Sequence, residues 1–458
     1  MTIRHFLVPA LLVLCLLLGG ASIPAEGGGF RGNLALQLLS IPLIGWALLR
    51  DPGNQPVPAR TLVLLAIALV AIVILQLVPL PPAIWTALPG RERVAEGFAM
   101  IGQDLPWLPL SLHPEASIAS LLWLLPAFAA LLGIVRLGAY RTSVLAWSLV
   151  GVTIFSVMLS ALQLTGGGGS PFYLYVTTNP GMGVGFFANS NHQATLLLCA
   201  LPFAAALYAG RGRRGSIKGS SALAIVLGGV ALILVVGLAI NGSLAGAGLG
   251  VAVFVASALM LRFRKRPVPA WGPMVAVLGL AAAVALIFLG PTSGGALMKS
   301  TTDSTSSRQV MVGNTLAASA DYFPAGSGVG TFASVYRLSE DSAIATKQWV
   351  NHAHSDIVEI VLETGILGIL LLIALVWWWG RRSYAIWIRD EQPDHFARAA
   401  VIVSAAIMAH SFVDYPLRTA AISTVFAICL ALMAQPRPSA RARSSRDSGE
   451  EGPRHLSA

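Results

Sequence analysis

Long apolar runs alternate with short polar stretches along most of the 458 residues of the chain. A helix needs about 20 consecutive apolar residues to cross the hydrocarbon core of a bilayer. The pattern predicts twelve such helices, at residues 6–22, 33–49, 61–79, 117–135, 143–164, 191–209, 221–240, 244–261, 270–290, 356–378, 397–414 and 418–434. We therefore expect an all-α polytopic membrane protein with about 12 transmembrane helices in one membrane domain, residues 1–434.

Composition agrees with this prediction, because 55% of the residues are hydrophobic and only 11% are charged. Such a balance excludes an ordinary water-soluble globular protein. The first span, with Arg4 before it and small residues at its end, could also be a cleaved secretory signal. Cys15, Cys199 and Cys429 all fall inside predicted spans, so we expect them to be packing residues without disulfides.

The basic residues predict the orientation of the chain. Most of the 30 Lys and Arg fall on alternate connections and in the tail, which the positive-inside rule assigns to the cytoplasm. Both termini are then cytoplasmic, and residues 435–458 form a disordered tail. The net charge of +10 reflects this topology, because the basic residues are scattered over short loops, and we expect no nucleic-acid partner.

Three connections on the predicted outer side are long enough to fold: residues 80–116, 165–190 and 291–355. The last is a long loop between the ninth and tenth helices. The ionisable or polar residues that suggest function lie in these segments or close to the outer membrane boundary: Asn191, His192, Arg308, Arg337, His352, His354, Asp356, Glu359, Glu363, His410, Asp414 and Arg418. A transporter would instead be expected to place such groups near the bilayer midplane.

The stretch WVNHAHSDIVEIVLETGILG, residues 349–368, is the most informative of these. Asp356, Glu359 and Glu363 would form one stripe on a helix, and the first two also have the spacing of a capping box. Glu363 lies about 10 Å further along the helix, where a charge needs a partner in the bundle. His354, at the water boundary, is either a surface histidine or a base that accepts a proton from an incoming hydroxyl.

Other patterns in the sequence have simpler interpretations. The HxHxD pattern that starts at His352 is too short to indicate a metal site without further ligands, so we expect neither a metal nor a cofactor. GGGGSP at 166–171 lacks the Lys and Ser/Thr of a P-loop, and AGSGVGTF at 325–332 does not follow a strand in a βαβ unit. Both are typical of tight turns.

Four motifs together resemble those of the O-antigen ligase and polymerase superfamily, bacterial membrane enzymes that transfer lipid-linked glycans. They are FFANSNHQATLLLCALP (186–202), DYFPAGSGVGTF (321–332) at the family's distance after Arg308, NHAHSDIVEIVLETGILG (351–368), and HSFVDYPLR (410–418), which is similar to a stretch of the exopolysaccharide branch. The similarity spans roughly residues 80–434, with a family core at about 186–378.

The resemblance implies a glycosyltransferase of GT-C-like architecture in the bacterial inner membrane, with a periplasmic active site. Its donor would be an oligosaccharide linked through diphosphate to undecaprenol, and its acceptor a hydroxyl of a glycan or of lipid A-core. His354 would be the general base and Arg308 the group that stabilises the leaving diphosphate, in a metal-independent transfer with inversion. Further substrate or diphosphate contacts would come from Asn191, His192, Arg337, His352 and Arg418. Asp356, Glu363, His410 and Asp414 would support them.

One position departs from the family pattern. NGSLAGAGLG, residues 241–250, is similar to a family turn in which an arginine holds the donor diphosphate, but here Leu244 occupies that position. The role could pass to Arg308, Arg337 or Arg418. The motif at 410–418 favours a polymerase, while an O-antigen ligase, a protein O-oligosaccharyltransferase, a transporter or flippase, and a non-catalytic scaffold bound to export proteins remain alternatives.

Overall fold

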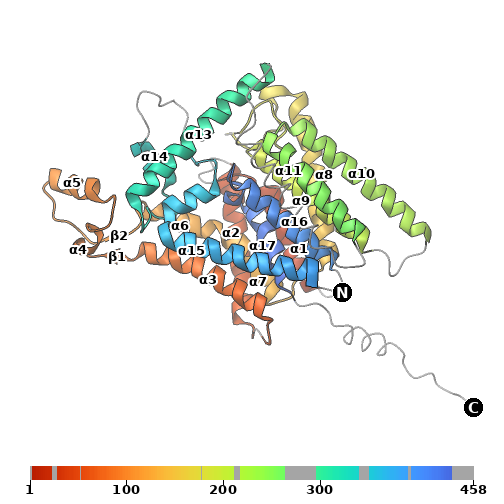
Figure 1. The fold of residues 1–458 in the computed structure, drawn as a ribbon, viewed down its shortest axis with the longest axis horizontal. Helices are drawn as coiled ribbons and strands as arrows, with labels where there is room; N and C mark the ends of the chain where they lie inside the picture. The colour runs from red at the N-terminus through yellow and green to blue at the C-terminus, as the bar shows by residue number, and fades with distance from the viewer. Residues whose placement is uncertain are drawn as a thin grey trace, which may run out of the picture.

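The computed structural model describes residues 3–22, 28–51, 53–176, 178–210, 217–263, 296–339, 350–389 and 394–435. Helices dominate this part of the chain (Figure 1). Their bounds are α1 Leu7–Leu18, α2 Gly28–Leu49, α3 Val57–Leu77, α4 Pro82–Trp85, α5 Glu92–Met100, α6 Pro114–Trp123, α7 Leu125–Val135, α8 Thr142–Thr165, α9 Ser190–Ala209, α10 Ile217–Asn241, α11 Leu244–Arg262, α13 Ala296–Tyr322, α14 Phe332–Ser339, α15 Asp356–Tyr384, α16 His395–His410 and α17 Ala420–Ala434. Short 3-10 turns cover Ile3–Phe6, Gly167–Gly169 and Pro416–Arg418, and a π-helical turn, Ala385–Arg389, follows α15.

The helices follow the predicted spans closely. Eight segments are long and apolar enough to cross a membrane, and α16, α17 and the first helical segment, Ile3–Leu18, are shorter apolar helices. The chain is thus an all-α polytopic membrane protein. The predicted span 270–290 and the predicted tail 436–458 lie outside the described residues, so the count of twelve stays a prediction.

Several predicted boundaries were wrong. The span predicted at 117–135 begins at Pro114 and consists of two helices that meet at Leu124, before Pro126. The span predicted at 397–414 ends at His410, so Asp414 lies in the turn that leads to α17. The loop predicted at 291–355 keeps its prediction as a segment long enough to fold, and it contains α13, a helix of 27 residues.

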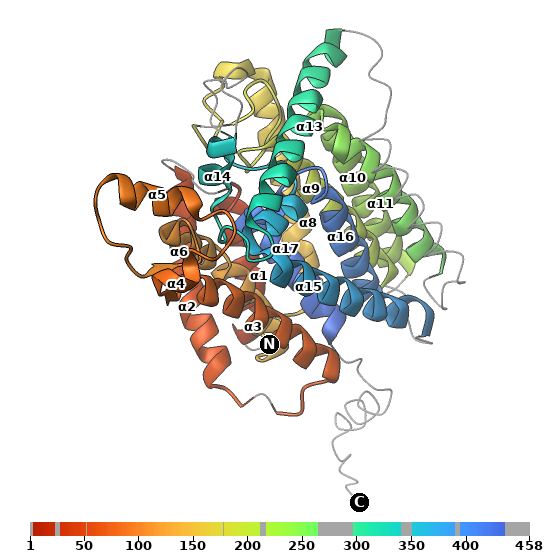
Figure 2. The same cartoon turned by 60° about the vertical axis from the view of Figure 1, so that its left-hand side comes forward.

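The centre of the bundle is built around α9. In the most apolar 18-residue stretch of α9, 83% of the residues are buried. The corresponding share is 22% in α3 and in α10. It packs against α8, α10, α11 and α16, while α17 packs against α7 and α16. Figures 1 and 2 show α10 and α11 on one flank, and α4, α5 and the two-stranded sheet on the other. That sheet pairs β1 (Pro79–Leu80) with β2 (Leu108–Pro109).

Four helices, α9, α11, α15 and α17, begin at the same end of the bundle, which we call the site end. A polar side chain caps each of them: Asn189, Ser243, Ser355 and Thr419 each accept a hydrogen bond from a backbone N–H of the first turn. Such caps satisfy donors that the helix itself leaves free. Two of the segments predicted on the outer side, 80–116 and 291–355, contact each other: Arg91 and Leu112 donate hydrogen bonds to the carbonyls of Gly326 and Ser327.

Candidate active site

Two segments far apart in sequence form the site end of the bundle. The backbone N–H of Asp356 donates to the carbonyl of Asp414 at 3.2 Å. The Asp356 carboxylate accepts from the Ser411 hydroxyl at 2.8 Å and from the backbone of Leu417 at 3.2 Å. The loop before α15 is therefore fixed against the turn between α16 and α17. These bonds also correct one expectation: Ser355, not Asp356, caps the helix, so the predicted capping box does not form.

His354 and Asp414 form a pair in this junction. Nδ1 of His354 lies 3.2 Å from Oδ1 of Asp414, and the side chain of His354 is 21% exposed while that of Asp414 is fully buried. A carboxylate can only accept, so the proton of the neutral imidazole sits on Nδ1 and Nε2 carries a free lone pair. The backbone angle φ of His354 is 54°. In the described part of the chain, His354 is the only residue other than glycine with a positive φ.

The Asp414 carboxylate is kept ionised by its surroundings. Burial alone would raise its pKa, but the hydrogen bond from His354 and the charges of His354, His192 and Arg308 outweigh burial and hold the pKa well below its usual range. An ionised Asp414 fixes the tautomer of His354 and would stabilise an imidazolium once the ring takes up a proton.

Arg308 acts electrostatically on the same junction. It lies half-buried on α13, which packs against α15. Burial, and after it the charge of Asp414, raises the pKa of the Tyr415 phenol. The charge of Arg308 opposes this rise. The charge of Arg308 thus acts on Asp414, the carboxylate that pairs with His354.

Arg418 has a different environment. Its guanidinium lies 3.6 Å from Asp356, 3.1 Å from Glu359 and 3.0 Å from Glu363. Burial would lower its pKa, but these three carboxylates raise it above its usual range. This guanidinium is occupied by carboxylates, so the geometry favours a structural role for Arg418 over the predicted contact with a diphosphate. Glu363 has the partner that its depth demanded.

Three of the predicted substrate-binding residues are buried in the protein. Nδ1 of His352 lies 3.2 Å from both oxygens of Glu359. Asn191 accepts from the Ser243 hydroxyl at 2.7 Å, which ties α9 to the start of α11. His192 is also buried, and neither of its ring nitrogens has a hydrogen-bond partner among the described residues. These three side chains are therefore enclosed by the protein. Arg337, by contrast, is exposed on α14.

His410 is a supporting residue as well. It is the last residue of α16, fully buried, and its Nδ1 lies 2.8 Å from the hydroxyl of Thr195. Because Thr195 belongs to α9, this contact joins α16 to α9 four residues before Asp414.

The glycine-rich turn at 325–332 holds a break in α15. Gly365 has non-helical angles, φ 55° and ψ −138°, and the helix cannot satisfy its own backbone there. The N–H groups of Ser327 and Gly328 donate at 2.9 Å to the carbonyls of Leu362 and Glu363. A Cβ at Gly326 would lie 2.6 Å from the Glu363 carbonyl oxygen, so only glycine fits this approach. The turn is structural, as its sequence predicted.

Sequence reasoning missed three residues of this region. Gln76 of α3 donates to the Glu363 carbonyl at 2.8 Å, and Arg91 donates to the Gly326 carbonyl at 3.0 Å. Tyr415, buried beside Asp414, packs among three histidine rings. Gln76 and Arg91 stand in apolar or loop sequence without a motif. Tyr415 was inside a quoted motif and could have been found from its place between Asp414 and Pro416.

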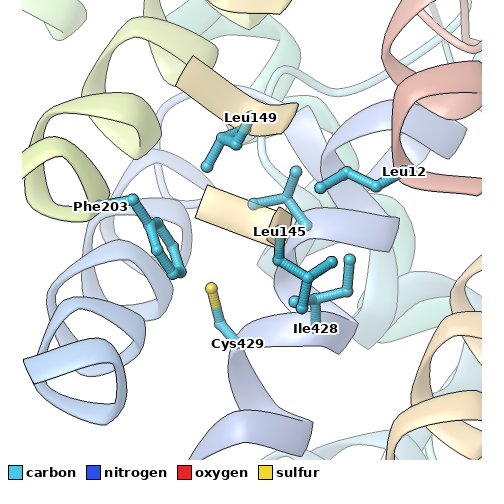
Figure 3. Close-up of a pocket in the computed structure, with 7 residues that line it drawn as sticks. Leu12, Leu145, Leu149, Phe203, Ile428 and Cys429 are labelled. Carbon is cyan, nitrogen blue, oxygen red and sulfur yellow. The ribbon is translucent and has the colours of Figure 1, made fainter. Parts of the chain in front are cut away.

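A small cavity elsewhere has no chemistry of its own. It lies between α1, α8, α9 and α17 and is lined by Leu12, Leu145, Leu149, Phe203, Val425, Ile428 and Cys429 (Figure 3). Its lining is apolar, and all three cysteines are buried and free, as expected from their positions in the spans. This cavity belongs to the core and is separate from the His354 junction.

The fold and the site together define a multi-pass helical membrane protein that gathers an imidazole–carboxylate pair and a guanidinium at one end of its bundle. Residues 228–373 match the family model for O-antigen ligase, and this match supports the predicted resemblance to the O-antigen ligase and polymerase superfamily. The matched segment contains both Arg308 and His354, whereas Asn191, His192 and the 410–418 turn lie outside it. No curated protein matches the chain.

This match supports, in broad terms, a function of the O-antigen ligase or polymerase type.

Proposed function

We propose that this protein transfers a glycan from undecaprenyl diphosphate to an acceptor hydroxyl on the periplasmic face of the inner membrane. The proposal rests on the His354–Asp414 pair. His354 can accept a proton, and the charge of Arg308 helps to lower the pKa of Asp414. A base and a cation are thus available at one place, beside helices that a polyprenyl chain can contact in the bilayer.

In the proposed step, Nε2 of His354 takes the proton of the acceptor hydroxyl. The oxygen attacks the anomeric carbon from the side opposite the diphosphate, so the new glycosidic bond forms with inversion. The bond from that carbon to the diphosphate oxygen breaks, and its electron pair leaves with undecaprenyl diphosphate. Arg308 stabilises the negative charge that grows on this leaving group, so the scheme requires no metal ion.

The other ionisable residues have supporting roles in this proposal. Asp414 orients His354, and His410 and Asp356 fix the turn that carries Asp414. Arg418 neutralises the carboxylates of α15. Leu244 is exposed at the start of α11 and supplies no charge, so the diphosphate depends chiefly on Arg308, with Arg337 as a second cation.

A biochemical test uses the purified protein with an undecaprenyl-diphosphate oligosaccharide. We expect release of undecaprenyl diphosphate together with an extended glycan of inverted linkage. A transporter, a flippase or a scaffold for export proteins would leave the lipid diphosphate intact, and that result would refute the proposal.

We favour polymerisation of a surface or exopolysaccharide as the particular reaction, because of the motif at 410–418. Deletion of the gene followed by analysis of surface glycan tests this choice. Single unpolymerised repeat units are expected for a polymerase. Full-length chains left on the carrier lipid would indicate a ligase to lipid A-core or to protein instead.

A further inference from the structure

We propose that Tyr415 is a positioning residue whose aromatic ring fixes the plane of the His354 imidazole. The inference rests on the proposed role of His354 as the base. Tyr415 does not touch the reacting atoms in this scheme; it acts through the histidine.

The ring of Tyr415 is the centre of a histidine cluster. Its centroid lies 5.1 Å from that of His354 and 5.0 Å from that of His192, both nearly edge-on, and 4.3 Å from that of His352. These histidines come from α9 and from the loop before α15. Tyr415 therefore separates three imidazoles and gives each a defined surface to pack against.

His354 needs such a second contact. Its bond to Asp414, at 3.2 Å, fixes one ring nitrogen but leaves the ring free to turn about that bond. Its positive φ is a conformation that a residue other than glycine holds only when its surroundings impose it. A flat aromatic neighbour stops the rotation and directs Nε2 to one place.

Tyr415 is itself well fixed. Its side chain is buried, and its backbone N–H donates at 3.0 Å to Oδ1 of Asp414, the oxygen that also faces His354. A hydrogen bond joins its phenol to the side chain of Asn189, the residue that caps α9. The ring is held at both ends, so it can serve as a rigid stop.

The test compares Tyr415→Phe with Tyr415→Leu in the full-length purified enzyme, by the rate of undecaprenyl diphosphate release. The phenylalanine keeps the ring, so its kcat should stay within about threefold of wild type. The leucine removes it, and misplacement of the base should lower kcat by about 10- to 100-fold with little change in KM for the donor. If the leucine variant does not fold, Tyr415→Met gives the same comparison, because methionine also lacks the ring and is close to leucine in volume.

A matched control is Tyr140→Leu, which removes a partly buried phenol ring that packs against the main core between α7 and the start of α8, at the opposite end of the bundle from His354. It should lower thermal stability without a comparable loss of kcat. A Tyr415→Leu enzyme with normal kcat, one with raised KM alone, or a Tyr415→Phe enzyme as slow as Tyr415→Leu would each overturn the positioning role.

The two hypotheses fail separately in this assay. If His354→Ala is fully active, the proposed function of His354 is wrong. If His354→Ala is inactive while Tyr415→Leu has the kcat of wild type, only the inference about Tyr415 is wrong.

Discussion

Two ionic clusters lie side by side at the site end and differ in how completely their atoms are paired. Around Arg418, one guanidinium contacts three buried carboxylates. Around His354, the imidazole contacts only one carboxylate. The two side chains are exposed to a similar extent, about a fifth each, so the difference lies in the number of their partners. Both are built from the same two stretches, 351–363 and 410–418.

The difference teaches how to separate structural from chemical charges in this bundle. A cation that contacts several buried carboxylates holds helices together, and it is strongly destabilising to remove it. An imidazole that has one carboxylate partner and a free lone pair on its second nitrogen is able to exchange a proton. We therefore assign Arg418 to the fold and His354 to the reaction, although the sequence presents both as polar residues at a membrane boundary.

The largest effect is expected from His354→Ala. Loss of a general base typically lowers a rate by about 10²- to 10⁴-fold, and the protein should still fold, because the side chain is partly exposed. The rate of undecaprenyl diphosphate release measures it. The control is His113→Ala, which removes an exposed histidine that contacts Ser334. If the two variants are equally active, His354 is not the base and the distinction between the two clusters is wrong.

Arg418→Met should act on stability. It leaves buried carboxylates without their cation, which costs about 3–5 kcal/mol, and the midpoint of thermal unfolding in detergent should fall accordingly. Arg418→Lys keeps the charge and should lose less. A stable, well-folded Arg418→Met protein that fails to bind the donor would show that Arg418 belongs to the substrate site after all.

Arg308→Met should act on the rate instead. Removal of one group that stabilises transition-state charge typically costs about 10²- to 10³-fold in kcat. Thermal unfolding should change little, in contrast to Arg418→Met, since Arg308 does not hold three buried carboxylates as Arg418 does. If unfolding moves as far as in the Arg418 variant while kcat per folded protein is unchanged, Arg308 is structural.

Asp414→Asn should have an intermediate effect. Substitution of a residue that orients a metal-bound histidine typically costs about 10- to 100-fold in activity, and we expect at least a loss of this order here. Since the pKa of Asp414 is lowered in the fold, the stability that its charge contributes is fully present above the unfolded pKa of about 3.9 and is lost as the pH falls through the folded pKa. Wild type should therefore lose stability more steeply than Asp414→Asn below about pH 4.

How far sequence could anticipate this picture depends on the range of the interactions. Helices such as α9 and α15 were predictable because crossing a bilayer imposes a length and an apolar composition on each segment. The need of Glu363 for a partner also followed from its depth. Its identity did not: Arg418 lies 55 residues away, and nothing local distinguishes it from Arg308 and Arg337, the other two arginines predicted for the diphosphate.

The same limit explains the helix break and the histidine cluster. Gly365 stands in an apolar run that reads as uninterrupted helix, and the break depends on the distant turn at 325–332. Tyr415 becomes notable only once α9 and the loop before α15 lie against it. Local patterns specified the elements, while long-range contacts selected which polar residues stay available.

The smallest effect is expected from Leu244→Arg. The side chain is exposed at the start of α11, where Ser243 contacts Asn191. A new guanidinium there should strengthen donor binding by up to about tenfold, as one charged hydrogen bond allows. KM for the lipid-linked donor reports it, with Leu244→Gln as the uncharged control. An unchanged KM would place the diphosphate away from this turn.

The central claim is tested most directly by a structure of the His354→Ala variant with an undecaprenyl-diphosphate oligosaccharide bound. We expect the diphosphate to contact Arg308, with the anomeric carbon facing the space left by the imidazole and Arg418 still on its three carboxylates. A diphosphate bound by Arg418, or bound where the space at position 354 cannot reach the sugar, would contradict the account.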